Sequence, residues 1–265
     1  MKIDDRAWDV VVTGGGPAGF IAAIAAARNG AATVLIEGSG CLGGVATSGL
    51  LSIWGAFDDR DRRLDFELDR RIAAGLPVPE RPSPGSRYIR GIPEEVLGRL
   101  VADGGALDYG TGCIPVNPEA LKRLAETMVM EAGAQIVYYA PAVSVEKTDG
   151  IITAVVVGSK AGLRRIRGCI IVDATGDGDV AFFAGAPFEK GRPEDGAMQG
   201  VTLVFRMGGV RFQGRSFWDQ QEVERYNALF RKAYDDGLVS AVYTVGCINS
   251  IPGMEGVVAI NTQHT

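Results

Sequence analysis

Three glycines near the N-terminus constrain the fold of this chain more than any other feature. Gly14, Gly16 and Gly19 directly follow the apolar run 9–13 and open an alanine-rich segment over residues 17–29. This spacing is typical of a strand, a tight turn and a buried helix, in which the glycines allow a sharp turn, close approach of a ligand and close helix–strand packing. The sequence therefore predicts a βαβ unit whose helix N-terminus binds the diphosphate of a dinucleotide.

The residues around these glycines support the same unit. Pro17 stands at the first helical position, where its missing N–H is not needed, and Ala18 follows it. A second buried strand is expected over 32–36 and ends at Glu37. A carboxylate there accepts hydrogen bonds from ribose hydroxyls and repels a 2′-phosphate, which disfavours NADP. The alternative is a tight turn in an unrelated α/β fold, but strand, glycines, helix, second strand and acid are all in register.

The glycine-rich loop after Glu37 bears on which dinucleotide is bound. The loop runs over 38–49, and a loop of this kind can wrap closely around more phosphate and ribityl than a simple nicotinamide dehydrogenase needs. FAD is therefore favoured, and an NAD-dependent dehydrogenase stays as the alternative. The residues of this loop that we expect at the cofactor are Gly38, Gly43, Gly44, Ala46 and Thr47.

The remaining sequence predicts an α/β domain with a meander of strands. Apolar periodicity, prolines and glycines mark the element ends. Helices are expected over 58–74, 93–102, 118–132 and 222–236, strands over 135–140, 143–147, 151–157, 164–173, 200–210 and 257–260, a hairpin turn at 148–150, and a proline-rich loop over 76–85.

Bulk properties exclude several classes of function. The formal net charge of −5 argues against a nucleic-acid-binding surface. The uncharged run 10–27 is broken by glycines and Pro17, so it does not predict a membrane span. Four scattered cysteines show no zinc spacing, so no metal site is expected, and they fit the reducing cytoplasm.

Five segments together resemble a known family. They are GGGPAG (14–19), LGGVATSG (42–49), the helix and strand over 117–136, DATGDGDVA (173–181) and VTLVFRMGGV (201–210). In this order they resemble the FAD-dependent oxidoreductases of the glutathione-reductase-like flavoprotein superfamily, especially a bacterial group loosely related to fumarate-reductase-type flavoproteins. Members of that family usually continue well beyond this length, so the chain is expected to be a C-terminal truncation or a shortened relative.

The resemblance implies roles for two further places in the chain. The backbone of Val143 is expected to contact the adenine. The turn formed by Ala174, Thr175 and Gly176 is expected to approach the ADP half of the cofactor, and Asp177 or Asp179 to take part through a hydroxyl or a water.

The resemblance also implies a domain plan and an activity. We expect an α/β fold: a dinucleotide-binding parallel sheet with a βαβ start and a β-meander crossover, plus a partial second α+β substrate or cap domain. The FAD-binding domain is placed at 1–198, with an insertion near 57–109, and the start of the cap domain at 199–265. The expected reaction transfers a hydride between flavin and an unidentified small organic substrate, with an unidentified electron donor or acceptor. A truncated, non-catalytic nucleotide-binding fragment is the other alternative.

No catalytic residue can be assigned from the sequence, because a flavin carries the redox chemistry itself. The single histidine, His264, is near the end of the chain. Arg206 is of more interest, since it lies inside an apolar strand and a buried arginine needs a partner. That partner is either a substrate carboxylate or an internal Asp or Glu.

Overall fold

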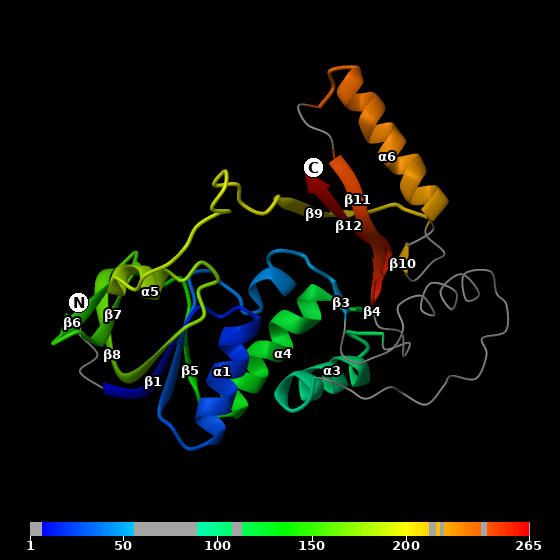
Figure 1. The fold of residues 1–265 in the computed structure, drawn as a ribbon. Coiled ribbons are helices and arrows are strands. Elements are labelled where there is room, and N and C mark those ends of the chain that lie inside the picture. Colours follow the sequence, from blue (N-terminus) through cyan, green and yellow to red (C-terminus); the bar gives the residue numbers. More distant parts are fainter. Residues whose placement is uncertain are drawn as a thin grey trace. The chain divides into compact units, whose positions relative to one another are not determined.

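The computed structural model describes residues 7–55, 89–107, 113–211, 216–217, 220–239 and 243–264. The helix expected over 58–74 and the loop over 76–85 lie outside these residues. The chain divides into two compact units, of which the first comprises residues 1–48 and 121–189 and the second residues 49–120 and 190–265 (Figure 1).

The first unit contains a six-stranded mixed sheet in the order β5-β2-β1-β8-β7-β6. Neighbouring strands pair in parallel from β5 to β8, and β8, β7 and β6 form an antiparallel meander. Three strands near the N-terminal glycines therefore end at the same edge, which is where α/β sheets bind ligands. The strands are β1 (Ala7–Thr13), β2 (Thr33–Ile36), β5 (Gln135–Val137), β6 (Ala142–Thr148), β7 (Ile151–Ser159) and β8 (Gly162–Asp173).

Helices and the meander cover the two faces of this parallel sheet. Right-handed crossovers place α1 (Pro17–Arg28) and α4 (Pro118–Glu131) on one face (Figure 1). On the other face the meander packs against the strands, with Val155 and Ile166 in one buried cluster with Val34. Burial on both faces explains why β1 and β2 are apolar without alternation. The unit also contains the short helices η1 (Gly44–Ala46) and α5 (Asp179–Ala184).

Two sequence predictions in the first unit have clear outcomes. The hairpin turn at 148–150 is confirmed, with Asp149 and Gly150 both left-handed at φ 50° and 81°. The strand expected over 135–140 was too long, because β5 ends at Val137. Tyr139 adopts φ 53°, which takes the chain out of the extended conformation.

The second unit is built on a four-stranded antiparallel sheet in the order β10-β11-β12-β9. Helix α6 (Gln220–Asp235) covers one face, where Tyr226 and Phe230 pack against Ile248, Val258 and Ile260. The strands are β9 (Thr202–Met207), β10 (Ser216–Phe217), β11 (Tyr243–Ile251) and β12 (Met254–His264); the unit also has α3 (Ile92–Ala102) and the paired strands β3 (Ile53–Gly55) and β4 (Cys113–Pro115).

The sequence did not reveal all of these strands. β11 was not expected, and β12 is longer than the predicted run 257–260. β3 and β4 have only three residues each, which is too short to show a periodic pattern. β3 and β4 pair with each other across about sixty residues of sequence, whereas β11 and β12 form a hairpin through the turn at 252–253.

The burial of β2 gives a testable prediction for the stability of the first unit. Leu35 is 0% exposed and lies on the helix-covered face of the sheet. Leu35→Ala should lower the free energy of unfolding by about 2–5 kcal/mol, because it leaves a cavity in a packed core. Leu163→Ala is the matched control, since Leu163 is 58% exposed in β8 and should change stability by only about 0.5 kcal/mol. Urea unfolding measures both, and equal effects would contradict the assigned core.

Candidate dinucleotide-binding site

The three glycines at the end of β1 have different structural roles. A Cβ on Gly14 would lie 2.3 Å from the carbonyl oxygen of Ala174, and one on Gly19 would lie 1.7 Å from the carbonyl oxygen of Gly14. These two positions exclude any side chain because backbone packs on backbone. A Cβ on Gly16 would meet no described atom within 4 Å. Gly16 therefore leaves its backbone open to a ligand.

The N-terminus of α1 begins at this open position. Gly16 is the N-cap and Pro17 the first helical residue, and none of the described side chains caps this end. The amides of Ala18 and Gly19 therefore lie in the first turn, where no partner exists within the helix. The first turn also contains no acidic residue. The free amides and the positive end of the helix dipole suit an anion such as a diphosphate.

Glu37 lies at the tip of β2 and faces the glycine turn, as the sequence predicts. One carboxylate oxygen accepts a hydrogen bond from the Gly15 amide at 2.7 Å, and the other accepts one from the Ser39 amide at 2.6 Å. A carboxylate has about four acceptor positions. Two are therefore left for further donors, and the ribose hydroxyls expected there stay a prediction.

The loop after Glu37 packs directly on the glycine turn. The Gly43 amide donates a hydrogen bond to the Gly15 carbonyl at 2.8 Å. A Cβ on Gly44 would lie 3.0 Å from the Cα of Gly16. Gly43 and Gly44 have φ values of 101° and 47°, which glycine adopts without strain. These two glycines allow the loop to approach the open face of the turn.

Ala46 and Thr47 anchor this loop through their buried side chains. Both are buried, and the Thr47 hydroxyl donates a hydrogen bond to the Leu42 carbonyl at 2.7 Å. Gly38 lies at the start of the loop, where a Cβ would approach Pro141 to 3.4 Å. The structure thus brings the loop residues to the strand ends, and their contact with a cofactor stays a prediction.

The turn after β8 lies beside the carboxyl end of β1. The Ala174 amide donates to the Thr13 carbonyl at 2.8 Å, which joins this turn to β1. Gly176 is left-handed at φ 93°, and both it and Asp177 are exposed. Ala174 and Thr175 therefore lie next to Gly14, and Gly176 and Asp177 follow them in the same turn at this edge of the sheet.

Sequence reasoning missed the residue that shapes this turn. Asp173 accepts hydrogen bonds from the Thr175 amide and hydroxyl through Oδ1, at 3.1 and 2.7 Å. Its Oδ2 accepts one from the Ala181 amide at 2.8 Å. The Thr175 hydroxyl in turn accepts one from the Asp179 amide at 2.9 Å. The available signal was an acidic residue ending an apolar strand just before a glycine turn.

Val143 lies at an irregularity of β6. Ala142 pairs with Val157 and Ser144 pairs with Val156, so Val143 is the extra residue of a β-bulge. An extra residue of this kind is left out of the ladder. Its backbone groups are therefore suited to hydrogen-bond a ligand, as the resemblance implies for the adenine.

Arg206 in the second unit has an internal partner. Its guanidinium donates to the Glu119 carboxylate at 2.8 Å, which corresponds to the internal alternative in the sequence analysis. Its Nε is buried with no hydrogen-bond partner in the part of the chain that is described. The Asn249 amide, on the same face of the sheet by register, donates to the Ser52 hydroxyl at 3.1 Å.

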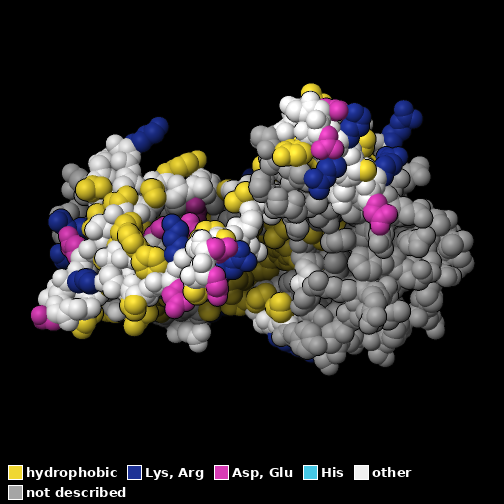
Figure 2. All heavy atoms as spheres, turned by 45° about the horizontal axis from the view of Figure 1, so that its top comes forward, with side chains coloured by type: hydrophobic (Ala, Val, Ile, Leu, Met, Phe, Trp, Pro, Cys, Tyr) yellow, Lys and Arg dark blue, Asp and Glu magenta, His cyan; other side chains and the backbone are white. Residues whose placement is uncertain are grey.

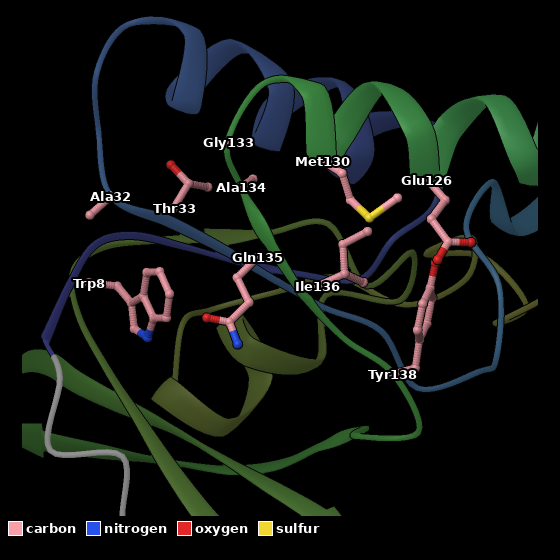
Figure 3. Close-up of a pocket in the computed structure, with 10 residues that line it drawn as sticks. All are labelled: Trp8, Ala32, Thr33, Glu126, Met130, Gly133, Ala134, Gln135, Ile136 and Tyr138. Carbon is pink, nitrogen blue, oxygen red and sulfur yellow. The ribbon is translucent and has the colours of Figure 1, made fainter.

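A pocket of about 570 Å³ lies beside the edge strand β5 (Figure 3). The Tyr138 hydroxyl is buried and makes no hydrogen bond of normal geometry to a described residue, although it faces the Glu126 carboxylate. Burial, and then this carboxylate, raise the pKa of Tyr138 to about 12. The lining residues are Trp8, Ala32, Thr33, Glu126, Met130, Gly133, Ala134, Gln135, Ile136 and Tyr138.

The surface charge of the described residues is mixed. Figure 2 shows acidic and basic side chains interspersed with apolar ones on the face in view. Several of the charged side chains form ion pairs at the surface, such as Arg192 with Asp195 and Lys232 with Asp236. None of the described helices is both long and apolar enough to cross a membrane.

Comparisons with known proteins identify a family. A family model described as FAD dependent oxidoreductase matches residues 9–244. A search of curated protein sequences found no match. Many solved structures share the fold.

Three of these structures show the extent of the likeness. A geranylgeranyl bacteriochlorophyll reductase-like protein from Thermoplasma acidophilum is 15% identical, with a TM-score of 0.54 over 97% of this chain and 56% of that one. A flavin-dependent brominase is 12% identical, with a TM-score of 0.54 over 97% and 56%. A p-nitrophenol 4-monooxygenase from Pseudomonas putida is 14% identical, with a TM-score of 0.51 over 97% and 57%. The chain thus spans about half the length of these proteins.

The different roles of the glycines give a prediction for binding. Gly16 has φ −64°, which alanine adopts easily, so Gly16→Ala should change the free energy of unfolding by only about 0.5 kcal/mol. The added methyl would stand before the first turn of α1 and should weaken FAD binding at least about tenfold by steric exclusion of the diphosphate. Gly19→Ala should instead destabilise the fold itself by about 2 kcal/mol or more. Urea unfolding and flavin titration separate the two effects, and an unaltered FAD affinity in Gly16→Ala would contradict this site.

Tyr138 gives a prediction for the alkaline range. Its pKa is about 12 in the folded protein and 10.0 in its ordinary state, so above pH 10 the unfolded chain loses this proton first. Stability should therefore fall as pH rises from 10 to 12. Tyr138→Phe removes this contribution, and the variant should lose less free energy of unfolding between pH 9 and pH 11 than the wild type. Identical losses in urea unfolding would contradict the assignment.

Proposed function

Because the chain belongs to the family of FAD-dependent oxidoreductases, we propose that it binds FAD across the carboxyl ends of β1, β2 and β8 and acts on a small organic substrate. When bound, FAD supplies hydride-transfer chemistry. The protein supplies binding, orientation and electrostatics for that chemistry. The physiological electron donor or acceptor is a second small molecule or protein partner of this reaction.

The observation that carries this proposal is the space beside Gly16, together with the Glu37 carboxylate at the tip of the next strand. Gly16 presents bare backbone in front of the first turn of α1, and Glu37 retains acceptor capacity at the tip of the next strand. A diphosphate and a ribose are adjacent groups in ADP, and Glu37 is hydrogen-bonded to Gly15, the residue directly before Gly16. The ADP half of FAD therefore fits the residues present.

The neighbouring residues have proposed roles that follow from their positions. Gly43 and Gly44 let the loop after β2 approach the diphosphate. Gly176 and Asp177 approach it from the end of β8. The backbone of Val143, the extra residue of the bulge, contacts the adenine.

The two units have separate proposed tasks. The first unit, with its parallel sheet, holds the cofactor, and the second, with its antiparallel sheet, is the substrate or cap part. The scattered single cysteines support a cytoplasmic location.

The direct test is reconstitution of the purified full chain with FAD. A flavin absorption spectrum that stays with the protein through gel filtration, and that bleaches with dithionite, is the expected result. FAD should also raise the melting temperature more than NADH does. A colourless protein that binds no flavin would contradict the proposal. Anaerobic reduction with a panel of small organic substrates then identifies the substrate class.

Glu37 provides a residue-level prediction. In Glu37→Gln, the side-chain NH₂ replaces an oxygen that accepts a hydrogen bond from a backbone N–H, so two donors face each other. The substitution also removes the negative charge that strengthens hydrogen bonds from the ribose hydroxyls. The FAD dissociation constant should rise about tenfold or more, as for loss of a hydrogen bond to a charged group. Glu189→Gln is the matched control, because Glu189 is an exposed carboxylate of the same unit, and its FAD affinity should equal that of the wild type. Equal affinities in both variants would remove Glu37 from the site.

A further inference from the structure

The backbone of Tyr139 is unusual for an aromatic residue. Three described residues other than glycine have positive φ, namely Leu50, Tyr139 and Asp149. Asp149 belongs to a tight hairpin turn, in which aspartate tolerates this conformation. Tyr139 has φ 53° and is 70% exposed, so burial of its ring does not explain the strain. Strained residues that are not required for packing are found preferentially at ligand sites.

The fold places Tyr139 beyond the ribose site. The strand order is β5-β2-β1, so a dinucleotide with its diphosphate at β1 and its ribose at the tip of β2 extends toward β5. The base attached to that ribose must therefore lie beside the loops that leave β2 and β5. Tyr139 is in the second of these loops.

Backbone hydrogen bonds join the loop after β2 to the loop after β5. The Tyr139 amide donates to the Ser39 carbonyl at 3.1 Å, and the Ala140 amide donates to the Glu37 carbonyl at 3.0 Å. A Cβ on Gly40 would lie 2.1 Å from the Tyr139 hydroxyl oxygen. The phenol therefore lies across the backbone of Gly40, which carries no side chain that would displace it.

We propose that Tyr139 is an adenine-binding residue whose ring stacks on the base of the cofactor. The phenol lies over Gly40, in the loop that begins at Glu37, whose carboxylate is the proposed partner of the ribose. An exposed phenol offers a flat apolar surface, and stacking on such a surface suits any purine. This inference rests on the proposed binding of FAD at the strand ends.

The test uses three variants of the full chain and two ligands. Tyr139→Gly removes the ring and relieves the positive φ, Tyr139→Phe keeps the ring, and Asp149→Gly relieves positive φ at a turn outside the site. The ligands are FAD and riboflavin 5′-diphosphate, which lacks the adenosine. Dissociation constants are measured by flavin fluorescence, and melting temperatures without ligand by circular dichroism.

Tyr139→Gly should bind FAD about tenfold more weakly than the wild type, the loss expected when one base loses its aromatic partner. Its affinity for riboflavin 5′-diphosphate should be unchanged, because that ligand has no base to stack. Tyr139→Phe and Asp149→Gly should bind FAD as the wild type does. The melting temperature of Tyr139→Gly without ligand should not fall.

Other results would overturn the inference in distinguishable ways. If the wild type binds FAD and Tyr139→Gly binds it equally well, the role of Tyr139 is wrong and the proposed function stands. If Tyr139→Gly weakens both ligands alike, or lowers the melting temperature, the residue is structural. If the wild type does not bind FAD, both proposals fail together.

Discussion

The close approach of backbone to backbone at the carboxyl end of β1 is the constraint on which the cofactor site depends. Gly19 fits against the carbonyl of Gly14, and Gly14 fits against that of Ala174, with no room for a side chain at either glycine. This packing joins α1, β1 and the turn after β8 into one rigid corner. Gly16, between these two glycines, is the N-cap of α1 and has open space where a Cβ would stand.

Glu37 links this corner to the loops that surround it. Its carboxylate binds amides of the glycine turn and of its own loop, and its backbone pairs with β5 and with Ala140. The same side chain thus orders the loops and keeps acceptor positions for a further donor. In the proposed binding of FAD, order in the loops and affinity for the cofactor are therefore coupled through this one residue.

The second unit combines an apolar and a polar face on one sheet. Ile248, Val258 and Ile260 pack under α6, whereas Arg206 and Asn249 lie on the other face and bond to Glu119 and Ser52. These polar pairs join segments that are far apart in the sequence. They hold the first turn of α4 and the residue before β3 on the sheet, which the order of elements along the chain did not indicate.

The sequence by itself determined the βαβ unit, its three glycines and the acid at the end of β2, because these features depend on local spacing and steric need. It also located the meander and its hairpin turn. Tertiary structure alone decided the early end of β5, the bulge at Val143, the role of Asp173 and the pairing of β3, β4 and β11. Most of these depend on hydrogen bonds or strand pairing with residues distant in the sequence or in an adjoining turn, which leave no periodic signal in the residues themselves. β11 is different, because it pairs with β12 across the short turn at Pro252 and Gly253, a local signal that the sequence did contain.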